Sequence, residues 1–200
     1  MYGVCLPYVR SIRQANRNCE GPVKKVLIGG VGNILLGDDG VGPYVLRLLE
    51  AMYEFGPGAE TVDLGTPALD LLYRIAGLDL LILIDAVDDG ERPGTVTAYR
   101  KADLIEHART VRMDPHSSAL SESLLAAELL DNGPQDVVLV GITIGTCDSG
   151  CSLSDAVEKA VGAAIRMVLE ELDRHRVPYT RRFGVRPDIW WAHDCQPHPA

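Results

Sequence analysis

Short runs of consecutive aliphatic residues are the feature that most restricts the fold of this chain. The runs LLILI at 80–84 and VVLV at 137–140 are too short for buried helices and show no polar alternation. Runs of this kind are typical of parallel strands that are covered on both faces. Because parallel strands need a crossover of a dozen or more residues between them, a helix is expected between successive strands.

Segments with helical periodicity do separate the apolar runs; Val41, Val45 and Leu49, for example, share one face of a predicted helix. We expect strands at 26–32, 60–65, 80–87, 94–100 and 136–144, with 94–100 at an edge or antiparallel, and helices at 41–53, 66–77, 102–109, 120–130 and 155–174. A capping box at Ser152–Asp155 is expected to start the last helix. This alternation predicts an α/β fold, a three-layer α/β/α sandwich with a mostly parallel, five-stranded twisted sheet and helices on both faces.

The two ends of the chain lack this pattern. We expect an N-terminal extension over 1–23, one domain over 24–175, and a C-terminal tail over 176–200. The extension has no apolar core of a secretory signal, and the five cysteines do not form a small disulfide framework, so a reduced, cytoplasmic protein is expected. The sequence leaves open whether the Trp190–Trp191 pair packs on the domain.

The charge balance narrows the range of partners. The net charge is −9 and the sequence pI is about 5.0, and the excess of acids falls in the middle of the chain. Nucleic-acid binders usually present a basic face, and no apolar run is long enough to cross a membrane. We therefore expect no nucleic-acid partner and no membrane association. An acidic body favours cations or basic peptide as partners, although such a surface also serves solubility.

In open α/β sheets the ligand lies beyond the carboxyl ends of the strands. The first strand leads into the loop GVGNILLGDDG at 30–40. A dinucleotide-binding loop would need glycine at position 35, which is Leu35, and two acids stand where a pyrophosphate would meet the helix. No Walker sequence of Gly-Lys-Ser/Thr occurs either, so a nucleotide site is not predicted.

A second interpretation of the acids is the receiver domain of a response regulator. Asp38 and Asp39 after the first strand and Asp85 after the aliphatic run have that layout. Phosphoryl chemistry of this kind also needs a lysine at the end of the last strand to compensate charge. No lysine stands at the end of the strand predicted at 136–144, so this interpretation fails.

A metal site of two carboxylates and one imidazole fits better. Asp39, Asp85 and His116 fall in segments predicted at one edge of the sheet, and His116 is in a Pro-bounded loop of the domain. This ligand set leaves coordination positions open and suits nickel or zinc, which can polarise a carbonyl and activate water. Asp38 is predicted to be structural or to lie behind the ligands, capping the helix near Val41.

Nucleophilic alternatives fit the sequence less well. There is no G-x-S-x-G elbow for a serine nucleophile. Cys147 and Cys151 are four residues apart, which is not the C-x-x-C spacing of a redox motif.

With these residues in place, the sequence resembles the hydrogenase maturation endopeptidases, which trim the large-subunit precursor of nickel-iron hydrogenases. The matching pieces are GVGNILLGDDGVG (30–42), DLGTPALDLL (63–72), LLILIDAVDDGERPGTV (80–96), DPHSSALSESL (114–124) and VVLVGI (137–142), with the later Leu153-Ser154, and together they cover about 26–172. The ends of the chain and the pair Cys147 and Cys151 lie outside the resemblance.

The resemblance implies a five-stranded α/β domain whose metal ligands are Asp39, Asp85 and His116. It implies a peptidase that removes a short C-terminal peptide from the precursor. Nickel already inserted in the precursor is the implied recognition signal, so the substrate supplies the metal, and other divalent ions can occupy the site. We expect a monomer. The alternative is a non-enzymatic assembly chaperone that senses nickel in the same precursor.

Overall fold

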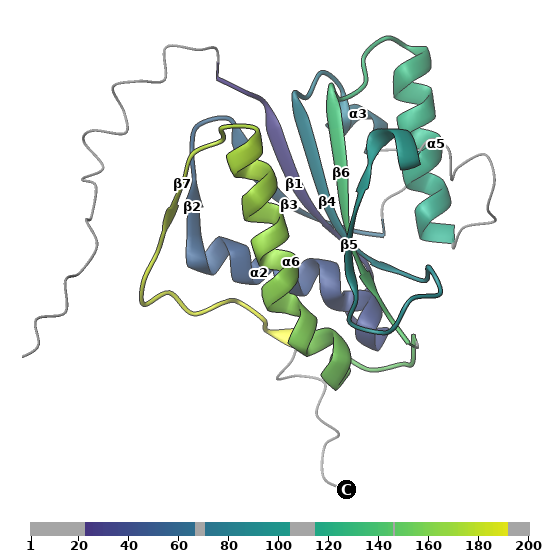
Figure 1. Cartoon of the computed structure of the whole chain (residues 1–200), viewed down its shortest axis with the longest axis vertical. Helices are drawn as coiled ribbons and strands as arrows, with labels where there is room; N and C mark the ends of the chain where they lie inside the picture. The colour runs from purple at the N-terminus through teal and green to yellow at the C-terminus, as the bar shows by residue number, and fades with distance from the viewer. Residues whose placement is uncertain (1–22, 67–70, 105–114, 146, 192–200) are drawn as a thin grey trace, which may run out of the picture.

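A five-stranded sheet forms the centre of the computed structural model, which describes residues 23–66, 71–104, 115–145 and 147–191, without the side chains of 115–121 (Figure 1). The strands are β1 (Val26–Val31), β3 (Ala59–Gly65), β4 (Leu80–Val87), β5 (Val96–Arg100) and β6 (Asp136–Thr143), in the order β3-β1-β4-β6-β5. The strands β3, β1, β4 and β6 pair in parallel with their neighbours, and the edge strand β5 pairs antiparallel with β6.

Helices cover both faces of the sheet. Helices α2 (Val41–Met52) and α6 (Asp155–Arg174) share one apolar core with the strands, and α3 (Leu71–Ile75) and α5 (Pro115–Leu129) lie on the opposite side (Figure 1). Leu83 and Leu139 are buried, as expected for central strands. The predicted three-layer α/β/α sandwich is confirmed.

Side chains of β4 alternate between the two cores. Leu80, Ile82 and Ile84 pack into the core that contains α2 and α6. Leu81 and Leu83 pack into the core that contains α3 and α5. Because side chains alternate along a strand, Asp85 continues the second set and lies on the α3 and α5 side.

Several predicted boundaries needed correction. Helix α5 starts at Pro115 rather than at 120, because proline fits the first helical position, where its missing N–H is not needed. Of the helix predicted at 66–77, residues 67–70 lie outside the described residues and α3 covers Leu71–Ile75. Of the helix predicted at 102–109, only 102–104 are described, and they are helical.

The predicted capping box at the last helix is wrong. The N-cap of α6 is Ser154, whose backbone is extended and whose side chain accepts a hydrogen bond from the N–H of Val157. Ser152 lies two residues before this N-cap and is exposed. The first residue of α6 is Asp155, a favourable place for an acid at the positive end of the helix dipole.

The described part of the C-terminal segment is attached to the domain at two places, whereas residues 180–188 are exposed. Strand β7 (Tyr179–Arg181) pairs antiparallel with β2 (Tyr53–Phe55), and the ring of Tyr179 meets that of Tyr53 edge to face. Trp191 is buried, whereas the neighbouring Trp190 is half exposed. Trp191 therefore anchors this segment. None of the helices in the described ranges is long and apolar enough to cross a membrane.

Candidate functional site

Asp85 occupies a distinct position at the carboxyl edge of the sheet. The pairing of β1 with β4 ends at Gly30 and Ile84, so Asp85 is the first β4 residue beyond β1 and pairs with Gly141 of β6. Asp85 as a whole is only 5% exposed, although it carries a carboxylate. A nearly buried carboxylate at the open edge of a parallel sheet is a strong candidate for a functional group.

The start of α2 is pressed directly onto this edge. A Cβ atom on Gly42 would lie 2.1 Å from the carbonyl oxygen of Val31 and 2.4 Å from that of Ile84. A Cβ atom on Gly30 would in turn lie 2.8 Å from the carbonyl oxygen of Gly42. These glycines allow the helix to approach the ends of β1 and β4, and they bring the residues just before α2 to the same edge as Asp85.

The short 3-10 helix η1 (Gly37–Gly40) immediately precedes α2 and carries Asp39. Asp39 is 7% exposed, and its Oδ2 accepts a 2.7 Å hydrogen bond from the backbone N–H of Asn33. The Asn33 side chain accepts a hydrogen bond from the N–H of Leu35, which closes the turn. Gly32 has φ +132°, and any Cβ there would lie 1.9 Å from the carbonyl oxygen of Asp39. The loop therefore fixes both the carboxylate and the backbone of Asp39.

Asp38 is engaged elsewhere. It is 4% exposed, and its two carboxylate oxygens accept hydrogen bonds from the backbone N–H (2.6 Å) and the hydroxyl (2.8 Å) of Ser154. The prediction that Asp38 caps the helix near Val41 is wrong, because the N-cap of α2 is Gly40, without a side-chain hydrogen bond. Asp38 instead contacts the N-terminus of α6, where the helix dipole favours a carboxylate.

His116 lies in the first turn of α5 rather than in a loop. Its side chain is outside the described residues. Helix α5 leads through 130–135 to the amino end of β6, so it runs opposite to the parallel strands, and its first turn faces their carboxyl ends (Figure 1). The backbone at 116 thus lies toward the edge and on the sheet face where Asp85 projects.

The structure thus brings Asp39 and Asp85 to one edge by two different routes. Asp39 comes from the helix before α2, and Asp85 comes from β4 itself. Within the residues described, no three His, Cys, Asp or Glu side chains form a group that could hold a metal ion. The His116 side chain lies outside the described residues, so it does not count toward such a metal-binding group.

Sequence reasoning missed Asp89, which organises the loop after β4. The hydroxyl of Tyr99 donates a 2.5 Å hydrogen bond to Asp89 Oδ2, and the hydroxyl of Thr143 donates a 3.0 Å bond to Oδ1. Burial acts to raise the pKa of Asp89, but the bonds from Tyr99, the Glu91 N–H and Thr143 hold this pKa below its usual value. Burial and the neighbouring Asp89 raise the pKa of Tyr99. The only sequence signal was an aspartate two residues before Glu91, typical of an Asx turn.

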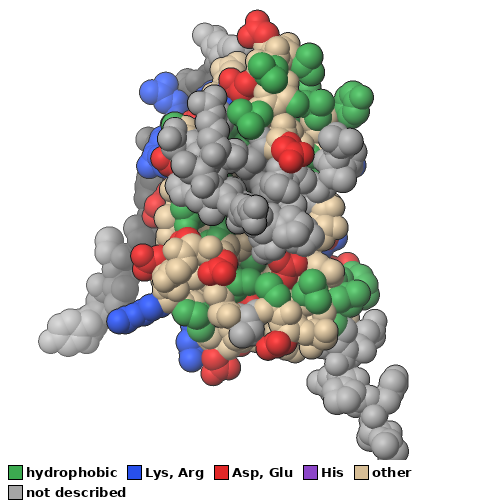
Figure 2. All heavy atoms as spheres, turned by 90° about the vertical axis from the view of Figure 1, so that its right-hand side faces the viewer, with side chains coloured by type: hydrophobic (Ala, Val, Ile, Leu, Met, Phe, Trp, Pro, Cys, Tyr) green, Lys and Arg blue, Asp and Glu red, His purple; other side chains and the backbone are tan. Residues whose placement is uncertain are grey.

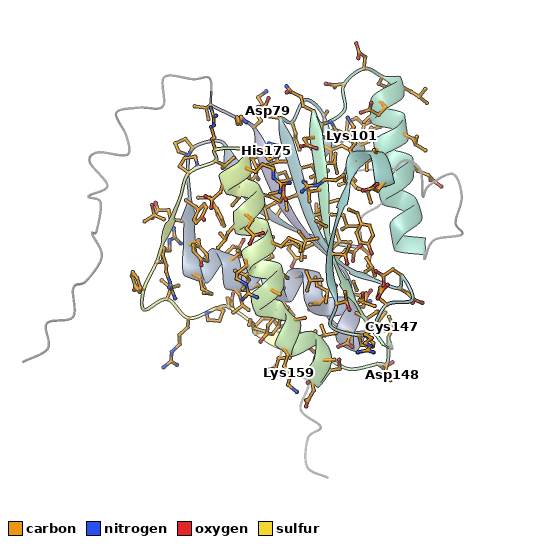
Figure 3. The ribbon with its side chains drawn as sticks, viewed as in Figure 1. Asp79, Lys101, Cys147, Asp148, Lys159 and His175 are labelled. Atoms are coloured by element: carbon orange, nitrogen blue, oxygen red, sulfur yellow. The ribbon has the colours of Figure 1, made fainter. Side chains whose placement is uncertain are left out.

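Acidic side chains are scattered over one side of the molecule. Figure 2 shows Asp and Glu side chains at several separate places on this side, among hydrophobic and other polar groups. Cys147 and Asp148, on the loop after β6, are exposed at the same end of the molecule as Lys159 near the start of α6 (Figure 3). This distribution agrees with the excess of acids seen in the sequence.

Comparison with known proteins defines the family. A family model described as hydrogenase maturation protease matches residues 43–171. The hydrogenase expression/formation protein HoxM of Azotobacter vinelandii is 32% identical over 160 residues, which cover 80% of this chain and 77% of that protein. The hydrogenase 2 maturation protease of Escherichia coli K12 is 32% identical over 149 residues, which cover 74% of this chain and 90% of that protein.

Solved structures agree with these relatives. The hydrogenase maturating endopeptidase HybD of Escherichia coli superposes with a TM-score of 0.75 at 30% sequence identity, over 79% of this chain and 98% of that one. The fold is thus that of the hydrogenase maturation proteases. The chain belongs to the hydrogenase maturation protease family.

Proposed function

We propose that this protein is an endopeptidase that removes the C-terminal peptide from the nickel-loaded large-subunit precursor of a nickel-iron hydrogenase. Membership of the protease family supports the class of reaction. The observation that carries the proposal is the pair Asp39 and Asp85, two nearly buried carboxylates that different elements deliver to the same open edge of the sheet. Carboxylate oxygens are donors that bind divalent cations, so two of them at one open edge support a metal site there.

We propose that Asp39, Asp85 and His116 bind the nickel that the precursor carries. The donor chemistry fits, because two carboxylates and one imidazole suit a borderline divalent ion and leave positions for ligands from the precursor. Asp39 Oδ2 is held by the Asn33 N–H, and no hydrogen bond from the described residues occupies Oδ1. Asp85 projects on the side of α5, whose first turn contains His116.

Nickel held at this edge would supply Lewis-acid polarisation of the scissile carbonyl or of a water molecule. The residues of the chain orient the precursor's metal site and accept the proton released in hydrolysis. If Asp85 binds the nickel through a single oxygen, it is the better proton acceptor, and Asp39 is the second candidate.

Incubation of the purified protein with precursor made with or without nickel tests this proposal. Mass spectrometry should show loss of a C-terminal peptide only from the nickel-loaded precursor, and His116→Ala should prevent it. Equal cleavage of nickel-free precursor, or full activity of His116→Ala, would contradict the role of the ligands. A stable complex with no change in mass would identify the protein as an assembly chaperone instead.

A further inference from the structure

The N-terminus of α6 is joined to the loop that carries Asp39. Besides the two hydrogen bonds from Ser154 to Asp38, the N–H of Gly37 donates a 2.7 Å bond to the carbonyl of Gly150. The N–H of Gly150 donates a 3.0 Å bond to the carbonyl of Leu35. The loop after β1 and the loop after β6 are thus held together by four hydrogen bonds, although Asp38 and Ser154 are 116 residues apart.

These four hydrogen bonds, called the clamp below, involve residues that adjoin Asp39 in the backbone. Asp38 directly precedes Asp39 in the 3-10 helix η1, and both residues are nearly buried. The Asp38 carboxylate is held by Ser154, and the Asp39 carboxylate is held by the N–H of Asn33. Gly37 has φ +56°, and a Cβ there would lie 3.0 Å from the carbonyl oxygen of Asp148, so the clamp also depends on a close approach of the two loops. A shift of Asp38 must move the backbone from which the Asp39 side chain extends.

We infer that Asp38 is a positioning residue for Asp39, and that it acts through Ser154 at the start of α6. Its two hydrogen bonds fix the 3-10 turn from one side, and the Asn33 N–H fixes the Asp39 carboxylate from the other. The clamp therefore sets where the remaining Asp39 oxygen points. This inference rests on the proposed function only in taking that oxygen to be a metal ligand.

The amide of Asn33 offers a direct readout, because its N–H donates to the Asp39 carboxylate. In ¹⁵N-labelled full-length protein, Ser154→Ala should shift this resonance, and Ser154→Thr, which restores the hydroxyl, should bring it back. Ser152→Ala is the matched control, because Ser152 is an exposed serine of the same loop. The change at Ser154 leaves the charge of the site unaltered, so a shift reports geometry rather than charge.

Affinity for Ni²⁺ alone, measured by calorimetry, is the second readout. Asp38→Asn should weaken it about 10–100-fold, as loss of groups that orient metal ligands commonly does. Ser154→Ala should weaken it in the same direction but less, because the backbone N–H still reaches Asp38. A purely structural role would instead lower the resistance to urea without moving either readout.

The inference would be overturned if the Asn33 amide resonance had the same position in folded Ser154→Ala as in Ser152→Ala. A shifted resonance with unchanged Ni²⁺ affinity would overturn it too, because the displacement would then not reach the ligand atom. If the wild-type protein bound no Ni²⁺ and processed no precursor, the proposed function would fail, and the Asn33 resonance alone would decide whether Asp38 positions Asp39. If Asp38→Asn did not fold, the Asn33 resonance and the Ni²⁺ affinity of the Ser154 variants would decide whether Asp38 positions Asp39.

Discussion

Arg100 on edge strand β5 donates two hydrogen bonds of 2.7 Å to the two carboxylate oxygens of Glu171 on α6. Glu171 is buried, and Arg174 lies 3.1 Å from the same carboxylate. The pair joins the antiparallel edge of the sheet to the last helix, on the face away from α5. Its bidentate geometry is the strong form of an ion pair.

Arg100→Met should lower the free energy of unfolding by about 2–4 kcal/mol, because it leaves the buried Glu171 with only the more exposed Arg174 as a partner. Urea unfolding at pH 7 measures the change. Lys159→Met is the control, since the Lys159–Asp155 pair is exposed and 3.7 Å long and should contribute less than about 0.5 kcal/mol. Equal effects of the two changes would contradict the assignment.

The same pair predicts how stability depends on pH. Burial acts to raise the pKa of Glu171, but Arg100 and Arg174 outweigh it and hold this pKa below the usual glutamate value. A lowered pKa in the folded state means that the stabilisation is complete above the unfolded-state pKa, which is near 4.3 for glutamate. It is lost as the pH falls from there through the folded-state pKa. The stability difference between wild type and Glu171→Gln should therefore shrink in urea titrations below about pH 4.3; a constant gap would contradict it.

Gly42→Ala should destabilise the fold although alanine is the better helix former. The new Cβ would meet the backbone oxygens of Val31 and Ile84, which cannot rotate away. We expect a loss of about 1–3 kcal/mol in thermal or urea unfolding. Gly162→Ala in α6 is the control, because its Cβ would meet only the flexible side chain of Arg166 at 3.7 Å, and it should stabilise the helix by about 0.5–1 kcal/mol. The same sign for both variants would refute the close-approach argument.

Asp85→Asn should abolish processing of the nickel-loaded precursor while the fold is retained. The change keeps the shape of the side chain but removes its charge, and loss of a ligand should cost at least about 10–100-fold in rate. Asp148→Asn, at an exposed aspartate on the same end of the molecule, should process normally (Figure 3). Circular dichroism checks the fold, and mass spectrometry of the precursor measures the rate. Normal processing by folded Asp85→Asn would remove Asp85 from the site.

The features that the sequence predicted well are those with a local cause. The run at 80–84 must be a buried strand, because its continuous aliphatic character leaves no exposed face. Asp85 follows from that strand, since its place at the end of the run puts it at the carboxyl edge. The start of α5 is predicted less accurately, because a proline such as Pro115 fits a loop as well as the first position of a helix.

The features that the sequence did not predict depend on distant partners. Nothing near Asp38 indicates that Ser154 will bind it, because the contact arises only when α6 packs beside α2. The two-residue offset between Ser152 and Ser154 could not be decided locally, since either serine can cap a helix. The strands β2 and β7 have only three residues each, too few to show a period.

The position of α6 after all five strands of the sheet has a consequence for synthesis. All five strands of the sheet precede residue 144, but the helix that completes the cover over Leu80, Ile82 and Ile84 begins only at Asp155. Until residues 155–174 have been synthesised, the nascent chain holds a half-covered aliphatic face. Exposed apolar surface of this kind promotes aggregation, so a holding chaperone that covers this face would protect the nascent chain.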